Sequence, residues 1–323
     1  IEIVVIADPI NTIYGGAISP YLAALKKAGA NVTMCKLEKL RDSNIYYSLF
    51  WRFTFRWLGN NSKGGLMPHP FGGQSVTARS WLRLLNFKAD HRKVFIADTP
   101  NGLEAIVASG NAHDASSAHH NVAAKFSGPA VMDLLESELA VLRFSNGRLP
   151  VTKIDNLSEI GPVTVQVLTE KQIERIVLET LRDLQPGDRI DLAYFYLSDR
   201  GITRALEKTH ARGVAIRILL DPNKDAFGYT KMGIPNRQTA HILQQAGLAV
   251  RWFDTHGEQG HAKMLHAHFI DGRDLLLIGS CNLTRRNLDN FNLETSVALR
   301  GPIDDTVFQD ASAYFERVWG NQP

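Results

Sequence analysis

The segment Glu294-Thr-Ser-Val-Ala-Leu-Arg-Gly-Pro302 has a counterpart earlier in the chain, Asn121-Val-Ala-Ala-Lys-Phe-Ser-Gly-Pro129. In both, a polar residue stands seven positions before a Gly-Pro pair, and a stretch with helical spacing follows. A Ser-x-Asn triplet lies ten or twelve residues further back, at Ser109-Gly-Asn111 and at Ser280-Cys-Asn282. Three matches in the same order indicate an internal repeat.

Each half of the repeat opens with an apolar strand, a helix that ends at a glycine, and a second strand. Such a unit implies parallel strands joined by a crossover helix. We therefore expect an α/β fold of two similar domains, residues 1–150 and 151–323, with mixed sheets flanked by helices and a pseudo-twofold relation. The expected segments are residues 1–7, 19–28 and 32–37 in the first half and 190–197, 203–212 and 214–220 in the second.

The composition is that of an ordinary globular protein. Of 323 residues, 44% are apolar and 21% charged, which excludes wholesale disorder, and the net charge of +3 indicates no particular partner. Cys35 and Cys281 are too few for a disulfide framework. No apolar run is long enough to span a membrane. Because Ile1 already opens a strand-like run, we expect that upstream residues, an anchor or signal among the alternatives, have been removed.

A His-x-Lys triplet precedes each Ser-x-Asn. His91-Arg-Lys93 begins 20 positions before Asn111, and His261-Ala-Lys263 begins 21 positions before Asn282. Residues i and i+2 of a strand project to one face, so each triplet is expected to present an imidazole and an ammonium side by side. If the two halves face each other, one cleft at their interface collects six candidate catalytic residues, namely His91, Lys93, Asn111, His261, Lys263 and Asn282.

These motifs resemble those of the phospholipase D superfamily. His91-Arg-Lys93 with Asp98 is similar to its H-x-K-x-x-x-x-D motif, and Gly279-Ser-Cys-Asn282 to its G-S-x-N motif. The similarity covers nearly the whole chain and is weakest between residues 42 and 76. Residues 86–93, 128–131 and 292–294 resemble the bacterial cardiolipin synthase branch. The resemblance implies a supporting role for Asp98, Ser109, Asn121, Ser280 and Glu294.

The second motif departs from the family pattern. Seven residues after His261 the family has Asp, but this chain has His268, with Asp271 and Asp274 close behind. A competing alignment takes His266-Ala-His268 as the motif. We prefer His261, because it keeps the lysine and its spacing to Asn282 matches that of the first half. The acidic partner of the second motif remains open in either alignment.

The resemblance implies hydrolysis or transfer of a phosphodiester through a phosphohistidine. It implies His91 as the nucleophile and His261 as the acid and base, while the lysines and asparagines neutralise the phosphoryl oxygens. Neither a metal nor another cofactor is needed. Family members often have an acid at the position of Asn121, so we expect the two histidines to differ in basicity. His113, His119 and His120 with Asp114, and His266 with His268, could suggest a metal site, but we expect one of these histidines to line the cleft and the others to be solvated.

The preferred function is a phosphodiesterase or phosphatidyltransferase that acts on a glycerophospholipid. The alternatives are a nuclease of the same superfamily and a catalytically degenerate binding protein. Nine of the thirteen residues in Tyr46–Leu58 are aromatic or aliphatic, and eight basic residues lie between Tyr46 and Phe95. This segment is expected to contact a membrane surface; core packing and single-stranded nucleic acid are the alternatives. The resemblance favours a bacterial protein, membrane-associated or periplasmic.

Overall fold

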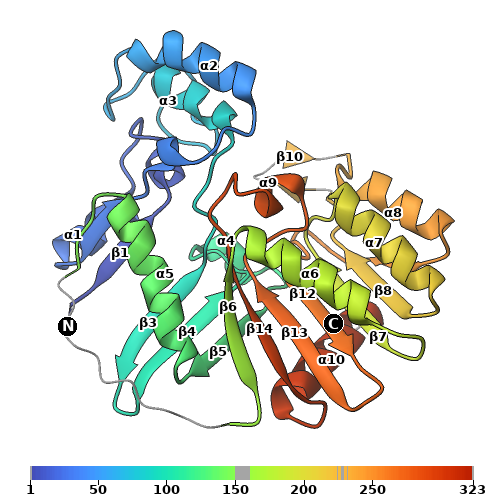
Figure 1. Cartoon of the computed structure of the whole chain (residues 1–323). Coiled ribbons are helices and arrows are strands. Elements are labelled where there is room, and N and C mark those ends of the chain that lie inside the picture. Colours follow the sequence, from blue (N-terminus) through green and yellow to red (C-terminus); the bar gives the residue numbers. More distant parts are fainter. Residues whose placement is uncertain (1, 150–160, 224, 227–228, 231, 322–323) are drawn as a thin grey trace. The chain divides into compact units, whose positions relative to one another are not determined.

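The computed structural model describes residues 2–149, 161–223, 225–226, 229–230 and 232–321 (Figure 1). The chain forms two compact units. Unit 1 contains the described residues of 1–91, 135–155 and 290–293, and unit 2 those of 92–134, 156–289 and 294–323. Unit 2 therefore combines strands from both halves of the sequence repeat. These compact units do not test the predicted division of the sequence repeat into domains 1–150 and 151–323, which stays a prediction.

Unit 1 begins with the expected strand–helix–strand. β1 and β2 pair in parallel, and Ser19 caps the N-terminus of α1 by accepting the Leu22 N–H at 3.4 Å. The second strand is shorter than predicted, because a 3₁₀ turn starts at Leu37. The helices and strands of unit 1 are β1 (Val4–Ala7), α1 (Pro20–Lys27), β2 (Asn31–Met34), α2 (Ile45–Phe53) and α3 (Ala78–Arg83), with 3₁₀ turns η1 (Pro9–Thr12), η2 (Leu37–Lys39), η3 (Phe55–Trp57) and η4 (Leu84–Asn86). α5 (Ala130–Phe144) contributes residues to both units.

Unit 2 is built on a seven-stranded mixed sheet with the order β11-β8-β7-β12-β13-β14-β6. β7, β8 and β11 are parallel, and the other neighbours are antiparallel. The strands are β6 (Thr164–Thr169), β7 (Arg189–Tyr194), β8 (Ala215–Leu220), β11 (Ala249–Trp252), β12 (Lys263–His268), β13 (Arg273–Gly279) and β14 (Thr295–Pro302). The predicted strand–helix–strand of the second half is confirmed as β7, α7 (Arg200–Ala211) and β8.

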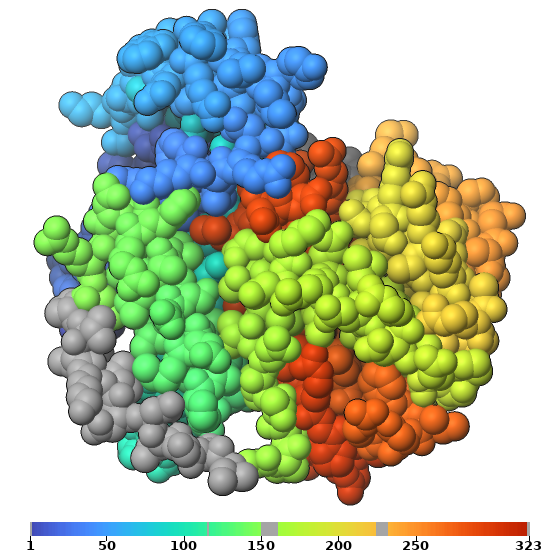
Figure 2. Space-filling model, viewed as in Figure 1, coloured from blue at the N-terminus to red at the C-terminus, as the bar shows by residue number. Residues whose placement is uncertain are grey.

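Helices cover one face of this sheet. In α6 (Lys171–Asp183) the buried residues Ile173, Ile176, Val177, Thr180 and Leu181 recur at helical spacing and form one apolar stripe. α7 and α8 (Asn236–Gln245) add their own stripes to the same core, which includes Leu192 and Leu265 of the sheet. Figure 2 shows α6 and α7 side by side on the surface of this unit.

The opposite face of the sheet packs against α10 (Thr306–Trp319) and a second, three-stranded sheet. Adjacent strand residues alternate between the two cores, as the pleat requires; Leu275 and Leu277 face the helices, and Leu276 and Ile278 face α10. The small sheet is antiparallel and consists of β3 (Val94–Thr99), β4 (Gly102–Ala108) and β5 (Ala123–Ser127). The remaining elements of unit 2 are α4 (Asp114–Ser117), α9 (Arg285–Leu288) and the short strands β9 (Asp225–Ala226) and β10 (Tyr229–Thr230).

Both halves thus contain three antiparallel strands followed by a helix, β3-β4-β5-α5 and β12-β13-β14-α10. This shared order agrees with the predicted duplication, which remains a prediction in its details. The α/β class with flanking helices is confirmed, although the seven-stranded sheet is mixed and the three-stranded sheet of the first half is antiparallel. Among the described residues, no helix is both long enough and apolar enough to cross a membrane.

Candidate active site

Two serines occupy equivalent positions directly after β4 and β13. Ser109 Oγ donates to Asn121 Oδ1 at 3.2 Å and accepts the N–H of the next residue after Asn121 at 2.9 Å. Ser280 Oγ donates to Glu294 Oε2 at 2.5 Å and accepts the N–H of the residue after Glu294 at 3.1 Å. Each serine therefore hydrogen-bonds to the side chain at the matching position of its half, Asn121 or Glu294. This arrangement is consistent with the expected supporting role of the serines.

Asn121 contacts the histidine of the other half. Its amide nitrogen donates to the carbonyl oxygens of Ser116 at 2.7 Å and His119 at 3.3 Å, so its Oδ1 faces His261 Nδ1 at 3.0 Å. An amide oxygen can only accept, and the proton of the His261 ring therefore resides on Nδ1. The lone pair of the neutral ring is then on Nε2, the atom that would take part in proton transfer or nucleophilic attack.

Lys263 is fully buried beside this histidine. Its Nζ donates to the His261 backbone oxygen at 2.7 Å and lies 5.2 Å from the centre of the Phe195 ring. Burial lowers the pKa of Lys263 well below its usual value, the charge of Lys93 lowers it further, and Glu294 opposes both. The two motif lysines therefore act on each other electrostatically. An anion bound here would relieve the penalty on the ammonium form.

The two motif asparagines differ in their surroundings. Asn282 is buried, and its Oδ1 accepts the Tyr196 N–H at 3.2 Å. Asn111 is exposed, and within the described residues its hydrogen bonds are made by its backbone, whose N–H donates to Ser116 Oγ at 2.9 Å and whose carbonyl accepts the His113 N–H at 2.9 Å. The two asparagines expected to donate to the phosphate are therefore not equivalent. The Asn282 side chain is buried and hydrogen-bonded, whereas the Asn111 side chain is exposed.

The expectation that each His-x-Lys lies within a strand is wrong. His91 and Lys93 precede β3, and the His91 N–H donates to Leu293 O at 2.9 Å within unit 1. Lys263 is the first residue of β12, and its ammonium turns toward the backbone of His261 rather than standing beside the imidazole. The reason is that each triplet makes other hydrogen bonds where its strand would have to begin. The His91 backbone bonds to Leu293, and the Lys263 side chain bonds to the His261 carbonyl.

The acidic position of the motif is occupied differently in the two halves. Asp98 is exposed near the end of β3, and its side chain has no hydrogen-bond partner in the described part of the chain. At the corresponding position, His268 Nδ1 lies 2.9 Å from Asp274 Oδ2, and His266 Nε2 lies 2.7 Å from the same oxygen. His268 Nε2 also faces Asp191 at 3.4 Å. His266 and His268, the alternative motif residues, are therefore engaged by buried carboxylates. The expectation that such histidines are solvated is wrong for this pair, because the strand buries both rings against Asp274.

The side chains of His266, His268 and Asp274 bring atoms that could bind a metal ion within 4.8 Å of one another. A tetrahedral zinc ion with bonds of about 2.0 Å separates its ligand atoms by about 3.3 Å. The contacts of 2.7 and 2.9 Å to one carboxylate oxygen are instead hydrogen-bond distances. The cluster is best described as a doubly hydrogen-bonded Asp274.

Asp221 is a site residue that sequence reasoning missed. It follows β8, and its carboxylate accepts the N–H groups of Gly260 at 2.7 Å and Asn223 at 2.6 Å. It thereby fixes the residue before His261. Burial raises the pKa of Asp221, although these hydrogen bonds oppose the rise. A polar residue directly after a buried parallel strand is the signal that could have found it.

His119 was expected only as one of several histidines near the cleft. Its Nδ1 accepts the Gln259 N–H at 3.2 Å, and its ring centre lies 5.9 Å from that of His261. His120 instead stacks on Phe253 at 5.6 Å. His119 is therefore the member of this group that lies beside the motif histidine.

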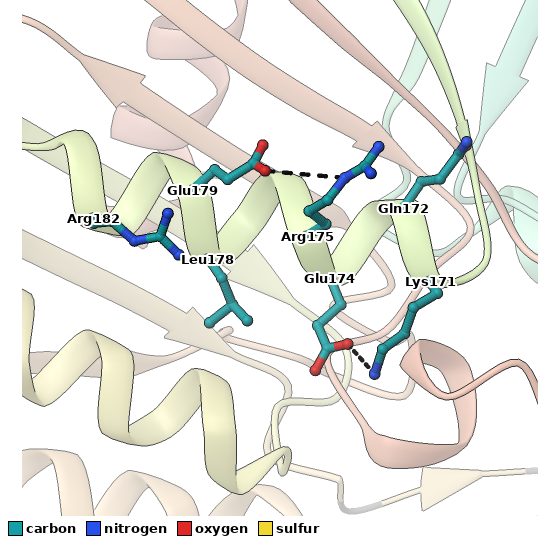
Figure 3. A pocket seen from close by; sticks show the side chains of 7 residues that line it. All are labelled: Lys171, Gln172, Glu174, Arg175, Leu178, Glu179 and Arg182. Atoms are coloured by element: carbon teal, nitrogen blue, oxygen red, sulfur yellow. Dashed lines mark ion pairs between the residues drawn. The ribbon is translucent and has the colours of Figure 1, made fainter.

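A separate pocket lies on α6 (Figure 3). Seven side chains of that one helix line it, and two ion pairs, Lys171–Glu174 and Arg175–Glu179, close within it. It contains none of the predicted site residues, and two of its three cations are paired with its two carboxylates. The pocket is a feature of the helix surface.

Residues 177–319 match the family model described as cardiolipin synthase, PLD-like domain. This part of the chain therefore belongs to the phospholipase D superfamily. The human mitochondrial cardiolipin hydrolase is 28% identical over 130 residues, which are 40% of this chain and 45% of the relative. The chain thus spans less than half the length of this relative.

Two solved structures share the fold over nearly the whole chain. Phosphatidylserine synthase of Haemophilus influenzae Rd KW20 aligns with a TM-score of 0.52 at 10% identity, covering 99% of this chain and 81% of its own. Polyphosphate kinase of Porphyromonas gingivalis aligns with a TM-score of 0.51 at 12% identity, covering 97% of this chain and 37% of its own. These similarities support the fold assignment of both halves.

Proposed function

We propose that the chain is a phosphodiesterase of phospholipase D type that acts on glycerophospholipids through a phosphohistidine. The observation that carries the proposal is the meeting of motif residues from both halves within unit 2. Asn121 of the first half is hydrogen-bonded to His261 of the second, and Lys93 acts on Lys263. Buried cationic and amide groups around a histidine are suited to bind a phosphodiester and to stabilise its transition state.

His91 joins this set through the chain itself. Lys93 is only two residues away, and two residues span at most about 7 Å between Cα atoms. The backbone therefore links His91 directly to the lysine whose charge acts on Lys263. This tether supports the proposal that the two imidazoles serve one anion.

In the proposed mechanism, His91 attacks phosphorus and forms an N–P bond while the P–O bond to the leaving alcohol breaks. His261, protonated on both nitrogens, gives its Nε2 proton to the leaving oxygen. The neutral ring then takes a proton from water or an acceptor alcohol, which attacks the phosphohistidine and releases His91. Lys93, Lys263 and Asn282 supply donors to the phosphoryl oxygens throughout.

The lipid substrate is inferred from the family description and from the relative named a cardiolipin hydrolase. We expect turnover of vesicular cardiolipin or phosphatidylglycerol, and no loss of activity in EDTA, because the lysines perform the neutralisation. Product release is measured by mass spectrometry of the lipids with and without chelator. Cleavage of DNA without lipid turnover would contradict the lipid assignment, and activity lost in EDTA and restored by zinc would contradict the metal-free mechanism.

Asn121 is proposed as the positioning residue for His261. Asn121→Ala is expected to lower kcat by about 10²- to 10⁴-fold, because the ring loses control of its tautomer. Asn121→Asp should keep substantial activity and move the basic limb of the pH–kcat profile to higher pH, because a carboxylate stabilises imidazolium. Profiles of the three proteins on one soluble diester test this. Identical limbs in wild type and Asn121→Asp would contradict the role.

A further inference from the structure

The most hydrophobic face of α2 is the one that points to solvent. Successive helical residues are rotated by about 100°, so Ile45, Tyr46, Leu49, Phe50 and Phe53 lie within an arc of about 140°. All five are exposed, Phe53 by 78%, and the following Trp57 is exposed by 76%. Atoms of this segment form part of the surface seen in Figure 2. We call these six side chains the apolar face.

The opposite side of α2 is firmly packed within unit 1. Ser48 and Trp51 are buried there. Ser48 Oγ donates to Asn86 Oδ1 at 3.1 Å, Tyr47 Oη donates to Leu82 O at 2.7 Å, and the Arg83 guanidinium lies 4.4 Å from the Trp51 ring centre. The helix orientation is thus fixed by polar and cation–π contacts, and the same packing leaves the apolar face exposed.

The surroundings of the apolar face are strongly basic. Residues 43–89 contain six lysines and arginines and no aspartate or glutamate. Arg52, Arg83 and Lys88 form ion pairs with Asp42 or Glu38. The other three, Arg56, Lys63 and Arg79, have no acidic partner within the described residues.

Two of these unpaired cations adjoin the apolar face. The Arg56 guanidinium lies 5.6 Å from the Trp57 ring centre, and Arg79 Nη1 donates to Leu58 O at 3.1 Å. The face therefore ends in aromatic rings with positive charges beside them. Aromatic side chains favour the interfacial level of a bilayer, and arginines beside them can reach anionic head groups.

We propose that the apolar face inserts into the interfacial layer of a membrane that contains anionic lipid. This inference rests on the proposed function, because it describes how the enzyme reaches a lipid substrate. A second copy of this chain fits the face poorly, because a twofold contact would bring the unpaired cations of both copies together. A nucleic acid would need its cations along the centre of the binding face, where this helix presents Ile45, Leu49 and Phe50.

The test is sedimentation with vesicles of phosphatidylcholine, with and without added phosphatidylglycerol. Wild type should bind the anionic vesicles more tightly. Phe53→Ser/Trp57→Ser should weaken partition by about 100-fold on either vesicle, because two large side chains no longer enter the apolar layer. Arg56→Gln/Lys63→Gln should weaken it by about tenfold on anionic vesicles alone. Tyr21→Ser, which removes a 74% exposed ring on α1 of the same unit, is the matched control and should bind like wild type.

The proposal is overturned if wild type does not bind anionic vesicles, if the Phe53/Trp57 variant binds like wild type, or if the Tyr21 control loses binding equally. A dimer in sedimentation velocity that dissociates in the Phe53/Trp57 variant would also overturn it. Turnover of a soluble diester, bis(p-nitrophenyl) phosphate, is measured in parallel and should be unchanged in the surface variants. Vesicle binding without any diester turnover would refute the proposed function alone, and soluble turnover without vesicle binding would refute this inference alone.

Discussion

Replacing His261 with alanine is expected to lower diester turnover by about 10⁴-fold or more while the fold survives. The variant has no group to protonate the leaving alcohol or to activate the acceptor. It loses the hydrogen bond to Asn121, which costs only about 1 kcal/mol of stability. The measurement is kcat on lipid and on a soluble diester, together with a thermal unfolding curve. His256→Ala, which removes an exposed histidine of the preceding loop, is the matched control and should retain full activity.

The same experiment decides between the two alignments of the second motif. His91→Ala should behave like His261→Ala, because both imidazoles are needed in one cycle. His266 is buried between Asp274 and Phe308, so His266→Ala should reduce stability but spare turnover at low temperature. Substantial activity in the His261 variant, with loss of activity in a folded His266 variant, would show that the alternative alignment is correct.

Replacing Asp274 with alanine should lower the free energy of unfolding by about 3–5 kcal/mol, because it leaves two buried histidines without their shared acceptor. Urea unfolding of the purified protein measures this change. Asp271→Ala is the matched control. That carboxylate is exposed and forms its ion pair with the neighbouring Arg273, so its loss should leave stability nearly unchanged. Equal effects of the two substitutions would contradict a structural role for the buried cluster.

The cluster also predicts how stability depends on pH. Burial alone would lower the pKa of His268, but hydrogen bonds to Asp191 and Asp274 outweigh it and raise that pKa above its usual value. The folded state therefore binds the proton more tightly than the unfolded state. The resulting stabilisation is complete below the unfolded value of about 6.5 and is lost as pH rises through the folded pKa.

Burial lowers the pKa of the neighbouring His266, so the unfolded state binds that proton more tightly and this ring makes stability rise with pH until both states have lost the proton. Wild type and His268→Gln both contain His266, so the test is the difference between their unfolding free energies, which should shrink as the pH rises above about 6.5. The same slope in both proteins, or a difference that grows with pH, would contradict the assignment.

Much of the fold was predictable because its signals are local. Apolar runs and glycine stops define β1-α1-β2 and β7-α7-β8, and both parallel pairs were found where expected. The Ser-x-Asn and Gly-Pro matches located the three-stranded segments of each half. The compact units were not predictable, because they depend on which faces pack together and not on the order of the repeat.

The site was predicted as a set of residue types but not as a network. Asn121 and His261 are 140 positions apart, and nothing in the sequence indicates that an amide of one half orients the imidazole of the other. The burial of Lys263 was also unforeseen, because a lysine at a strand start is ordinarily solvated. Asp274 was noticed only as a nearby acid, since its bonds to two histidines arise from the pairing of β12 with β13.

A crystal structure with bound tungstate, a phosphoryl-like oxyanion, addresses the shared site most directly. We expect one tungstate contacted by the Nε2 atoms of both His91 and His261, with Lys93 and Lys263 around it. An ion held by only one of these rings, or rings kept apart by intervening packed side chains, would contradict a common catalytic centre.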